Sequence, residues 1–359
     1  MVVTVGNDGA GIPGPDQGGG RPSEAPGRRQ FVNDPADLVF EALEGLERSR
    51  PELVRWNREP SFVVRADADW PRKVGVVSGG GSGHEPLHTG FVGAGMLDAA
   101  VPGSIFASPS AAQVHAATKA VDRGRGVLHI VKNYTGDIIN FGIAAEMAAD
   151  EGVEIETVVV DDDLATDMVD RDGPGRRGTA AVVAVEKICG AAAEAGAGLA
   201  EIAALGRRVV SGSRSMAIAL HAPTHPGERR PSFELGADEI EVGVGIHGER
   251  GTGRRPFAPA RELAELLVGP IAEAVGLRSG EAVIVIVNGL GSTHPLELSV
   301  MFMEASRLLE ALGVSVVRSL VGSFVTSLDM AGCSITVSRA DDELVGLWDA
   351  PVRTNALTW

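Results

Sequence analysis

Three short stretches of the sequence place histidine, lysine or carboxylate side chains among glycines, a combination that suits proton transfer or attack on a carbonyl group. In "EVGVGIHGERG", glycines with the spacing G-x-G-x-x-G surround His247. A dinucleotide-binding fingerprint requires such glycines to open a helix, but the glycines and prolines of the following "ERGTGRRPFAPA" prevent a regular one. We therefore interpret His247 as an exposed imidazole at a strand end, with glycines that leave room for a small ligand.

The stretch "SGGGSGHEP" follows a β-rich run and holds Gly81, Ser82, Gly83 and His84. Glycine lets a backbone approach a ligand closely and point its amides inward. The stretch does not match the phosphate loop G-x-x-x-x-G-K-[ST], because the lysine and hydroxyl are missing from their places. Two interpretations stay open: a histidine that works on a ligand, or one that is hydrogen-bonded to nearby backbone.

The stretch "IVKNYTGD" brings Lys132, Tyr134 and Asp137 to the carboxyl end of an expected parallel strand. Ligands of open α/β sheets bind at that edge. Asp137 is a candidate general base, and Lys132 is a candidate cation for a substrate oxygen. The alternative is that Asp137 only caps the helix expected after it.

A run of three aspartates, Asp161 to Asp163, follows another expected strand. Carboxylates in this position can bind Mg²⁺, but we favour a solvated strand end or a helix cap. Two basic spots, "GRRG" and "GRRP", are typical of loop residues that form salt bridges.

Strands that alternate with helices position these residues. Short β-rich runs at 73–78, 126–132 and 153–160 alternate with helical patterns at 110–124 and 140–152, which predicts a parallel sheet. The Ala-rich segment 179–210 predicts two helices broken near "GAG". The second half predicts further strands and helices. We expect two α/β domains, the first with a mainly parallel sheet flanked by helices and the second with a mixed sheet and helices.

We expect three parts along the chain: a disordered tail at 1–30, an N-terminal domain at 31–210 and a C-terminal domain at 211–359. The tail is rich in Gly, Pro and charge and cannot offset its ordering entropy by burial. The net charge of −16 disfavours nucleic acid and anionic membranes as partners. The two cysteines have no metal-site spacing, and no 18-residue apolar run occurs, so we expect no metal site and a cytoplasmic location.

Seven motifs in order resemble the substrate-binding K domain or subunit of dihydroxyacetone kinases. They are "SGGGSGHEPLHTGFVGAGML", "VKNYTGDIINF", "VVVDDDLA", "GRRGTA", "GVGIHGERG", "SLDM" and "LWDAP", and the resemblance covers residues 31–359. It implies that His247 binds dihydroxyacetone covalently, as a hemiaminal on Nε2. It also implies acid–base roles for His84 and Asp137, and substrate binding by Gly81, Ser82, Gly83 and Lys132.

The same resemblance implies a division of labour between chains. No cofactor is expected on this chain, and Mg-ATP or Mg-ADP is expected on a separate L subunit. That subunit either uses ATP as a substrate or keeps ADP that a phosphotransferase-system M protein recharges from phosphoenolpyruvate. A homodimer is expected as in the family.

Two alternatives stay open. One is a ligand-sensing regulator that binds the triose and docks on a transcription factor. The other is a kinase subunit for a related sugar such as erythrulose, and the loop "THPGERRPSFELG" is where such a change of substrate would lie.

Overall fold

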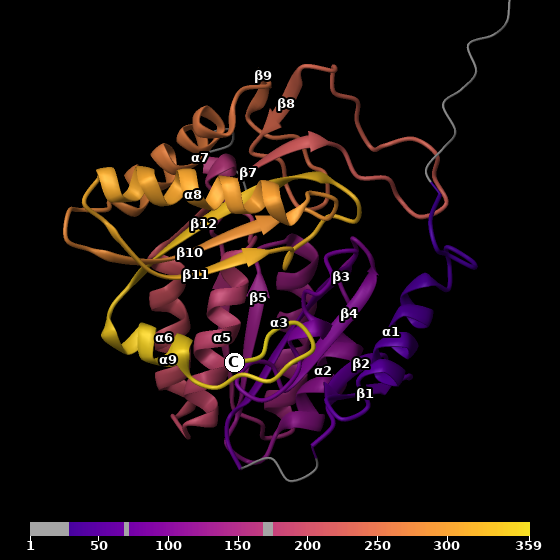
Figure 1. The fold of residues 1–359 in the computed structure, drawn as a ribbon. Coiled ribbons are helices and arrows are strands. Elements are labelled where there is room, and N and C mark those ends of the chain that lie inside the picture. The colour runs from indigo at the N-terminus through magenta and orange to yellow at the C-terminus, as the bar shows by residue number, and fades with distance from the viewer. Residues whose placement is uncertain (1–28, 68–71, 168–174) are drawn as a thin grey trace, which may run out of the picture.

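The computed structural model describes residues 29–67, 72–167 and 175–359. The tail expected at 1–30 lies outside the described residues, except for its last two positions. Two six-stranded sheets form the framework of the described part of the chain (Figure 1). The expectation of two α/β units, one mainly parallel and one mixed, is confirmed. The exact boundary at residue 210 stays a prediction.

The first sheet has the order β1-β2-β4-β3-β5-β6. Its strands are β1 (Val54–Asn57), β2 (Phe62–Arg65), β3 (Gly75–Ser82), β4 (Ala99–Ile105), β5 (Val127–Lys132) and β6 (Ile155–Val160). The last four run parallel to one another, and β2 and β1 continue the sheet in antiparallel pairing. The carboxyl ends of β3, β4, β5 and β6 therefore meet at one edge, where parallel sheets bind ligands.

The second sheet has the order β11-β10-β12-β7-β8-β9. Its strands are β7 (Ser213–His221), β8 (Glu239–Val242), β9 (Gly253–Pro256), β10 (Ala282–Gly289), β11 (Ser315–Gly322) and β12 (Ala331–Ala340). Only the β10–β11 pairing in it is parallel. This sheet carries the turn that holds His247.

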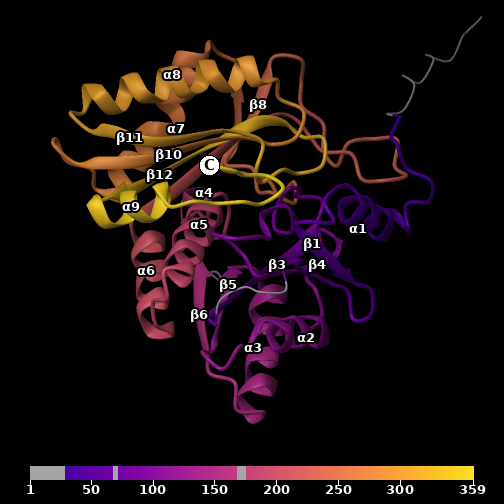
Figure 2. The ribbon, with the colours of Figure 1, turned by 60° about the horizontal axis from the view of Figure 1, so that its bottom comes forward.

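Helices separate and cover the sheets (Figure 2). The outer face of the first sheet packs on α2 (Ala111–Val121) and α3 (Thr135–Asp150). α5 (Ala181–Glu194), α6 (Leu199–Ser211) and α9 (Asp342–Asp349) lie between the sheets. α7 (Ala260–Val275) and α8 (Pro295–Ala311) cover the far face of the second sheet. The remaining described helices are α1 (Leu38–Ser49), η1 (Thr89–Phe91) and α4 (Leu164–Asp167). No described helix is long and apolar enough to span a membrane.

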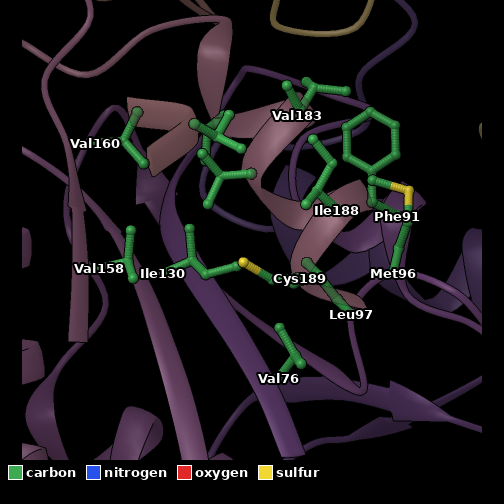
Figure 3. Close-up of a cluster of buried hydrophobic side chains, with 14 of the residues drawn as sticks. Val76, Phe91, Met96, Leu97, Ile130, Val158, Val160, Val183, Ile188 and Cys189 are labelled. Carbon is green, nitrogen blue, oxygen red and sulfur yellow. The ribbon is translucent and has the colours of Figure 1, made fainter. Parts of the chain in front are cut away.

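The core between the first sheet and α5 fixes the sheet's inner face. Figure 3 shows Cys189 of α5 beside Ile130 of the sheet, and Ile188 and Val158 belong to the same buried cluster. The helix pair α5–α6 breaks where the sequence predicted, at a residue with a left-handed backbone, Gly196. Both helices bury apolar side chains, so they connect the two sheets through one continuous core.

Two expectations about strands need correction. The glycine cluster after residue 78 is not a loop, because β3 continues through Gly79 to Ser82. A Cβ at Gly79 would meet the carbonyl oxygen of Val101 at 2.6 Å, so glycine permits close pairing with β4. His247 is not at a strand end, because β8 stops at Val242 and a turn carries the histidine.

The aspartate run is an internal junction rather than a solvated strand end. The buried Asp162 carboxylate accepts hydrogen bonds from Thr179 N (2.6 Å), Thr179 Oγ1 (2.7 Å), Ala181 N (3.0 Å) and the Ser215 hydroxyl. Its carbonyl oxygen also accepts the Ser215 amide at 2.8 Å. The described residues contain no cluster suited to a metal ion. Asp162 therefore links β6, the start of α5 and β7.

We expect Asp162→Ala to lower the free energy of unfolding by about 3 kcal/mol, because it leaves buried donors without an acceptor. Urea unfolding followed by circular dichroism measures this. Asp150→Ala, at the exposed end of α3, is the control and should change little. Equal unfolding midpoints for the two variants would contradict the role of Asp162.

Candidate active site

The site lies where the carboxyl edge of the first sheet meets the turn after β8. The ring centroids of His84 and His247 are 4.9 Å apart, although 163 positions separate the two residues in the sequence. Those of Tyr134 and His247 are 4.6 Å apart. The structure thus brings together the three stretches that the sequence singled out.

His247 is oriented by a carboxylate two residues away. Its Nδ1 lies 2.9 Å from Glu249 Oε1, and its backbone amide donates to Glu249 Oε2 at 2.9 Å. Because a carboxylate accepts hydrogen bonds, Nδ1 carries the proton and Nε2 keeps a free electron pair. The imidazole side chain is 21% exposed, so it is half-buried rather than exposed as expected.

The charge of Glu249 is well stabilised. Burial raises its pKa, but the hydrogen bond from His247 and the guanidinium of Arg177 outweigh burial and hold it at about 2. Glu249 therefore stays ionised and keeps accepting from Nδ1 of His247. Sequence reasoning missed Glu249, although its place immediately after the G-I-H-G motif is a usable signal.

Aromatic rings enclose the imidazole of His247. Phe106 lies 5.3 Å from it between centroids and stacks on His84 at 5.0 Å. Tyr134 meets it edge-on at 83°, and the buried Tyr134 hydroxyl has no hydrogen-bond partner among the described residues. Burial raises the pKa of Tyr134 well above its usual value, so the phenol stays protonated. Phe106 holds a left-handed backbone (φ 55°), a conformation that marks functional sites.

His84 is a buried, uncharged imidazole. Its Nδ1 lies 2.7 Å from the carbonyl oxygen of Thr326, which can only accept, so Nδ1 carries the proton. Its Nε2 is buried without a hydrogen-bond partner among the described residues. Burial, with the charge of Lys132 acting in the same direction, lowers the pKa of His84 well below its usual value. The backbone interpretation is confirmed for Nδ1, and a role of Nε2 toward a ligand stays a prediction.

Asp137 lies in the first turn of α3, but its side chain does not cap the helix. Tyr134 occupies the N-cap position, and no side-chain cap is formed. The carboxylate instead accepts the Ser108 hydroxyl through Oδ1, and its Oδ2 lies 3.7 Å from Lys132 Nζ. Both Asp137 and Lys132 are almost fully buried. The geometry therefore favours a carboxylate poised beside a cation over a simple cap.

The residues of the glycine-rich segment that were expected to bind substrate make contacts within the protein in this structure. A Cβ at Gly81 would meet the backbone of Phe106 and Ala107 at 2.7 Å, so this glycine permits the approach of the residue 106 turn. The Ser82 hydroxyl donates to Gly103 O at 2.7 Å, and the Gly83 amide donates to Glu85 at 2.9 Å. In this structure both groups are engaged inside the protein, and their substrate-binding roles stay predictions.

The loop at 224–236 borders the site. Its His225 meets Phe106 edge-on, with centroids 5.2 Å apart. Sequence reasoning placed this loop near the pocket without naming a contact. It missed Ser108, Phe106 and Thr326, which come from the end of β4 and from the segment after β11.

We expect Glu249→Ala to release the tautomer of His247, because the acceptor of the Nδ1 proton is lost. Two-bond ¹H–¹⁵N spectra of the histidine rings would show the Nδ1–H form in the wild type and a population with Nε2–H in the variant. Glu228→Ala, an exposed carboxylate in the neighbouring loop, is the control. An unchanged His247 ring spectrum in Glu249→Ala would contradict this assignment.

Comparison with known proteins identifies relatives. The chain is 42% identical over 358 residues to the dihydroxyacetone-binding subunit of the PEP-dependent dihydroxyacetone kinase of Escherichia coli (strain K12), covering 92% of this chain and 99% of the relative. The crystal structure of the C. freundii dihydroxyacetone kinase superposes with a TM-score of 0.83 at 35% identity, covering 92% of this chain and 60% of that chain.

A dihydroxyacetone kinase operon co-activator superposes with a TM-score of 0.84 at 32% identity, covering 88% of this chain and 97% of that chain. The model of the Dak1 domain matches residues 44–356, which is most of the sequence. The chain therefore belongs to the Dak1 domain family.

Proposed function

We propose that this chain is the dihydroxyacetone-binding subunit of a dihydroxyacetone kinase, and that it holds the ketone as a hemiaminal on His247 Nε2. The observation that carries the proposal is the orientation of His247: Glu249 occupies Nδ1 and leaves Nε2 with its electron pair. The E. coli relative, a dihydroxyacetone-binding subunit by name, supports the choice of substrate.

The covalent step balances without a cofactor. Nε2 of His247 attacks the carbonyl carbon, the C–N bond forms and the carbonyl π bond breaks. The former carbonyl oxygen gains one proton from solvent, and Nδ1 releases one to solvent while Glu249 stays ionised, so the adduct has the summed mass of protein and ketone. Glycerol has no carbonyl and cannot form this bond, which separates two molecules that hydrogen bonding alone distinguishes poorly.

Phosphoryl transfer uses the other half of the site. Asp137 accepts the proton of the attacking hydroxyl, and His84 shares in the proton transfer through its free Nε2. Lys132 holds a substrate oxygen beside Asp137. The phosphoryl donor comes from an L subunit that carries Mg-ATP or Mg-ADP. The E. coli relative belongs to a PEP-dependent kinase, which makes phosphoenolpyruvate, relayed through an M protein, the first donor to test.

We keep a homodimer and a cytoplasmic location as parts of this proposal. Erythrulose stays an alternative substrate, because the loop carrying His225 borders the site.

The second candidate is a ligand-sensing co-regulator, and the similarity to the operon co-activator favours it. The two functions differ in what they require of the site. Sensing needs only the binding half around His247, whereas transfer also needs the carboxylate and cation formed by Asp137 and Lys132. The presence of that second half supports the kinase.

We expect native mass spectrometry to detect a ketone-dependent adduct of the wild type with dihydroxyacetone, no adduct with glycerol and none in His247→Ala. Erythrulose, tested in parallel, measures how far the pocket tolerates an extra carbon. An adduct that survives in His247→Ala would refute the covalent assignment.

We expect Asp137→Asn to lose turnover by about 10³-fold while it still forms the adduct, because the amide cannot take the hydroxyl proton. The assay combines the chain with an L subunit and either donor. Asp150→Asn, on the same helix but exposed, is the matched control. Full turnover in Asp137→Asn would exclude this carboxylate as the base. A wild type that binds the ketone but never transfers phosphate to it would favour the co-regulator.

A further inference from the structure

We propose that Glu186 and His88 are positioning residues that hold the Lys132 ammonium in the site, and that they hold it more firmly at alkaline pH. The inference deepens the proposed function and rests on it. Neither residue touches the site directly. They come from α5 and from the segment before η1, and both are buried.

A hydrogen-bonded chain runs from the site into the core. Lys132 Nζ lies 3.0 Å from His88 Nε2, and His88 Nδ1 lies 2.6 Å from Glu186 Oε1. The other neighbours of Nζ are the Gly79 carbonyl oxygen at 3.5 Å and Asp137 Oδ2 at 3.7 Å. An ammonium has three donors, so this arrangement aims one toward His88 and leaves the others directed at the site edge.

The donor and the acceptor of each hydrogen bond follow from the protons and electron pairs that the groups carry. An ammonium only donates, so His88 Nε2 accepts and Nδ1 must carry the ring proton. The hydroxyl proton of Ser78 goes to the Ile130 carbonyl at 2.8 Å, so Ser78 Oγ, 3.1 Å from Nδ1, acts as a second acceptor. The Nδ1 proton therefore points at Glu186. Lys132, His88 and Glu186 form a relay in which the charge of the carboxylate is felt by the ammonium.

The charged and titratable groups around Glu186 are few. They are Lys132 on β5, His88 beside β3 and Cys189 on its own helix, with Asp137 beyond Lys132. Burial, and then the charge of Lys132, lowers the pKa of His88 well below its usual value, so the ring stays neutral. Burial and the charge of Glu186 raise the pKa of Cys189 to about 12, so the thiol does not ionise near neutral pH.

Glu186 itself changes charge in an accessible range. Burial raises its pKa to about 8, and the charge of Lys132 opposes this rise only in part. Its Oε2 has no hydrogen-bond partner among the described residues, which adds to the cost of ionising it. Below pH 8 the carboxyl is neutral and accepts from His88. Above pH 8 it is ionised, and its negative charge strengthens the hydrogen bonds that run through His88 to the ammonium.

The test compares the wild type with Glu186→Gln, which keeps an acceptor for His88 but cannot ionise. Dihydroxyacetone affinity is measured calorimetrically from about pH 6.5 to about 9.5, a range that spans the ionisation of a buried carboxyl. We expect equal affinities below pH 7, and an affinity about tenfold weaker for Glu186→Gln at the alkaline end. Overlapping curves throughout, or a loss of equal size at every pH, would overturn the proposal.

Variants of His88 separate the two ends of the relay. The side-chain amide of His88→Asn lies near the position of Nδ1 and can reach only Glu186, whereas that of His88→Gln lies near Nε2 and can reach only Lys132. Neither variant therefore connects Lys132 to Glu186. Both should show the alkaline loss of Glu186→Gln. His129→Gln is the matched control, because His129 is also fully buried but bonds Thr118. The same alkaline loss in His129→Gln would mean general loosening and would overturn the proposal. If the His88 variants fail to fold, Glu186→Gln decides alone.

A ligand-free readout separates this inference from the proposed function. In ¹⁵N-histidine spectra the His88 Nδ1–H signal should shift with an inflection near pH 8 in the wild type. It should show no such inflection in Glu186→Gln. If the wild type binds no dihydroxyacetone, the proposed function is wrong, and this titration still judges the relay. A His88 signal without the inflection would overturn it.

Discussion

The site exists because a buried carboxylate joins the two sheets. Asp162 follows β6. Its carboxylate accepts hydrogen bonds from amides at the start of α5 and from the hydroxyl of Ser215 on β7, and its carbonyl oxygen accepts the Ser215 amide. These contacts fix the second sheet relative to the carboxyl edge of the first. The turn with His247 can then face His84 and Tyr134 at ring-contact distance. Loss of the Asp162 contacts would therefore disturb the orientation of the turn with His247 relative to His84 and Tyr134.

Within that frame, burial and directional hydrogen bonds divide the work between two similar side chains. Each imidazole donates through Nδ1, His84 to a carbonyl and His247 to a carboxylate, so both keep Nε2 as an electron-pair donor. Their surroundings differ. His84 is fully enclosed, whereas His247 keeps contact with solvent and has an ionised partner in Glu249. The Glu249 carboxylate can therefore stabilise positive charge that develops on the His247 ring when Nε2 forms a bond, whereas burial keeps the His84 ring neutral.

The sequence predicted the fold class and the residues whose motifs are local, because each motif lies in one continuous segment. His84, Lys132, Asp137 and His247 were singled out in this way. The first three meet at the parallel edge of the first sheet, whereas His247 comes from the turn after β8 of the second sheet. β4 was missed because "AAVPGSI" contains Pro and Gly and lacks a β-branched alternation. Ser108 and Phe106, which follow it, were missed for the same reason.

Other errors came from contacts that only the three-dimensional fold creates. The aspartate run was expected to be a solvated strand end or a helix cap. The solvated interpretation is wrong because Asp162 and Asp163 are both buried, whereas Asp163 accepts the Ala165 amide at the start of α4, as a helix cap does. Thr326 returns to His84 from 242 residues further along the chain, a separation at which no local pattern carries information. Glu186 lies in an Ala-rich helix that looked like ordinary core.

Gly80 shows how a site can depend on an atom that is missing. A Cβ there would overlap Lys132 Nζ and would approach His88 Nε2 at 3.5 Å and Asp137 Oδ2 at 3.6 Å. Three polar groups from three segments thus converge on the space left by one hydrogen atom. An alanine scan treats exchange at a glycine as mild, but here the added methyl group would push the cation out of place. The position in β3 that tolerates substitution least is therefore a glycine, which takes no part in the chemistry itself.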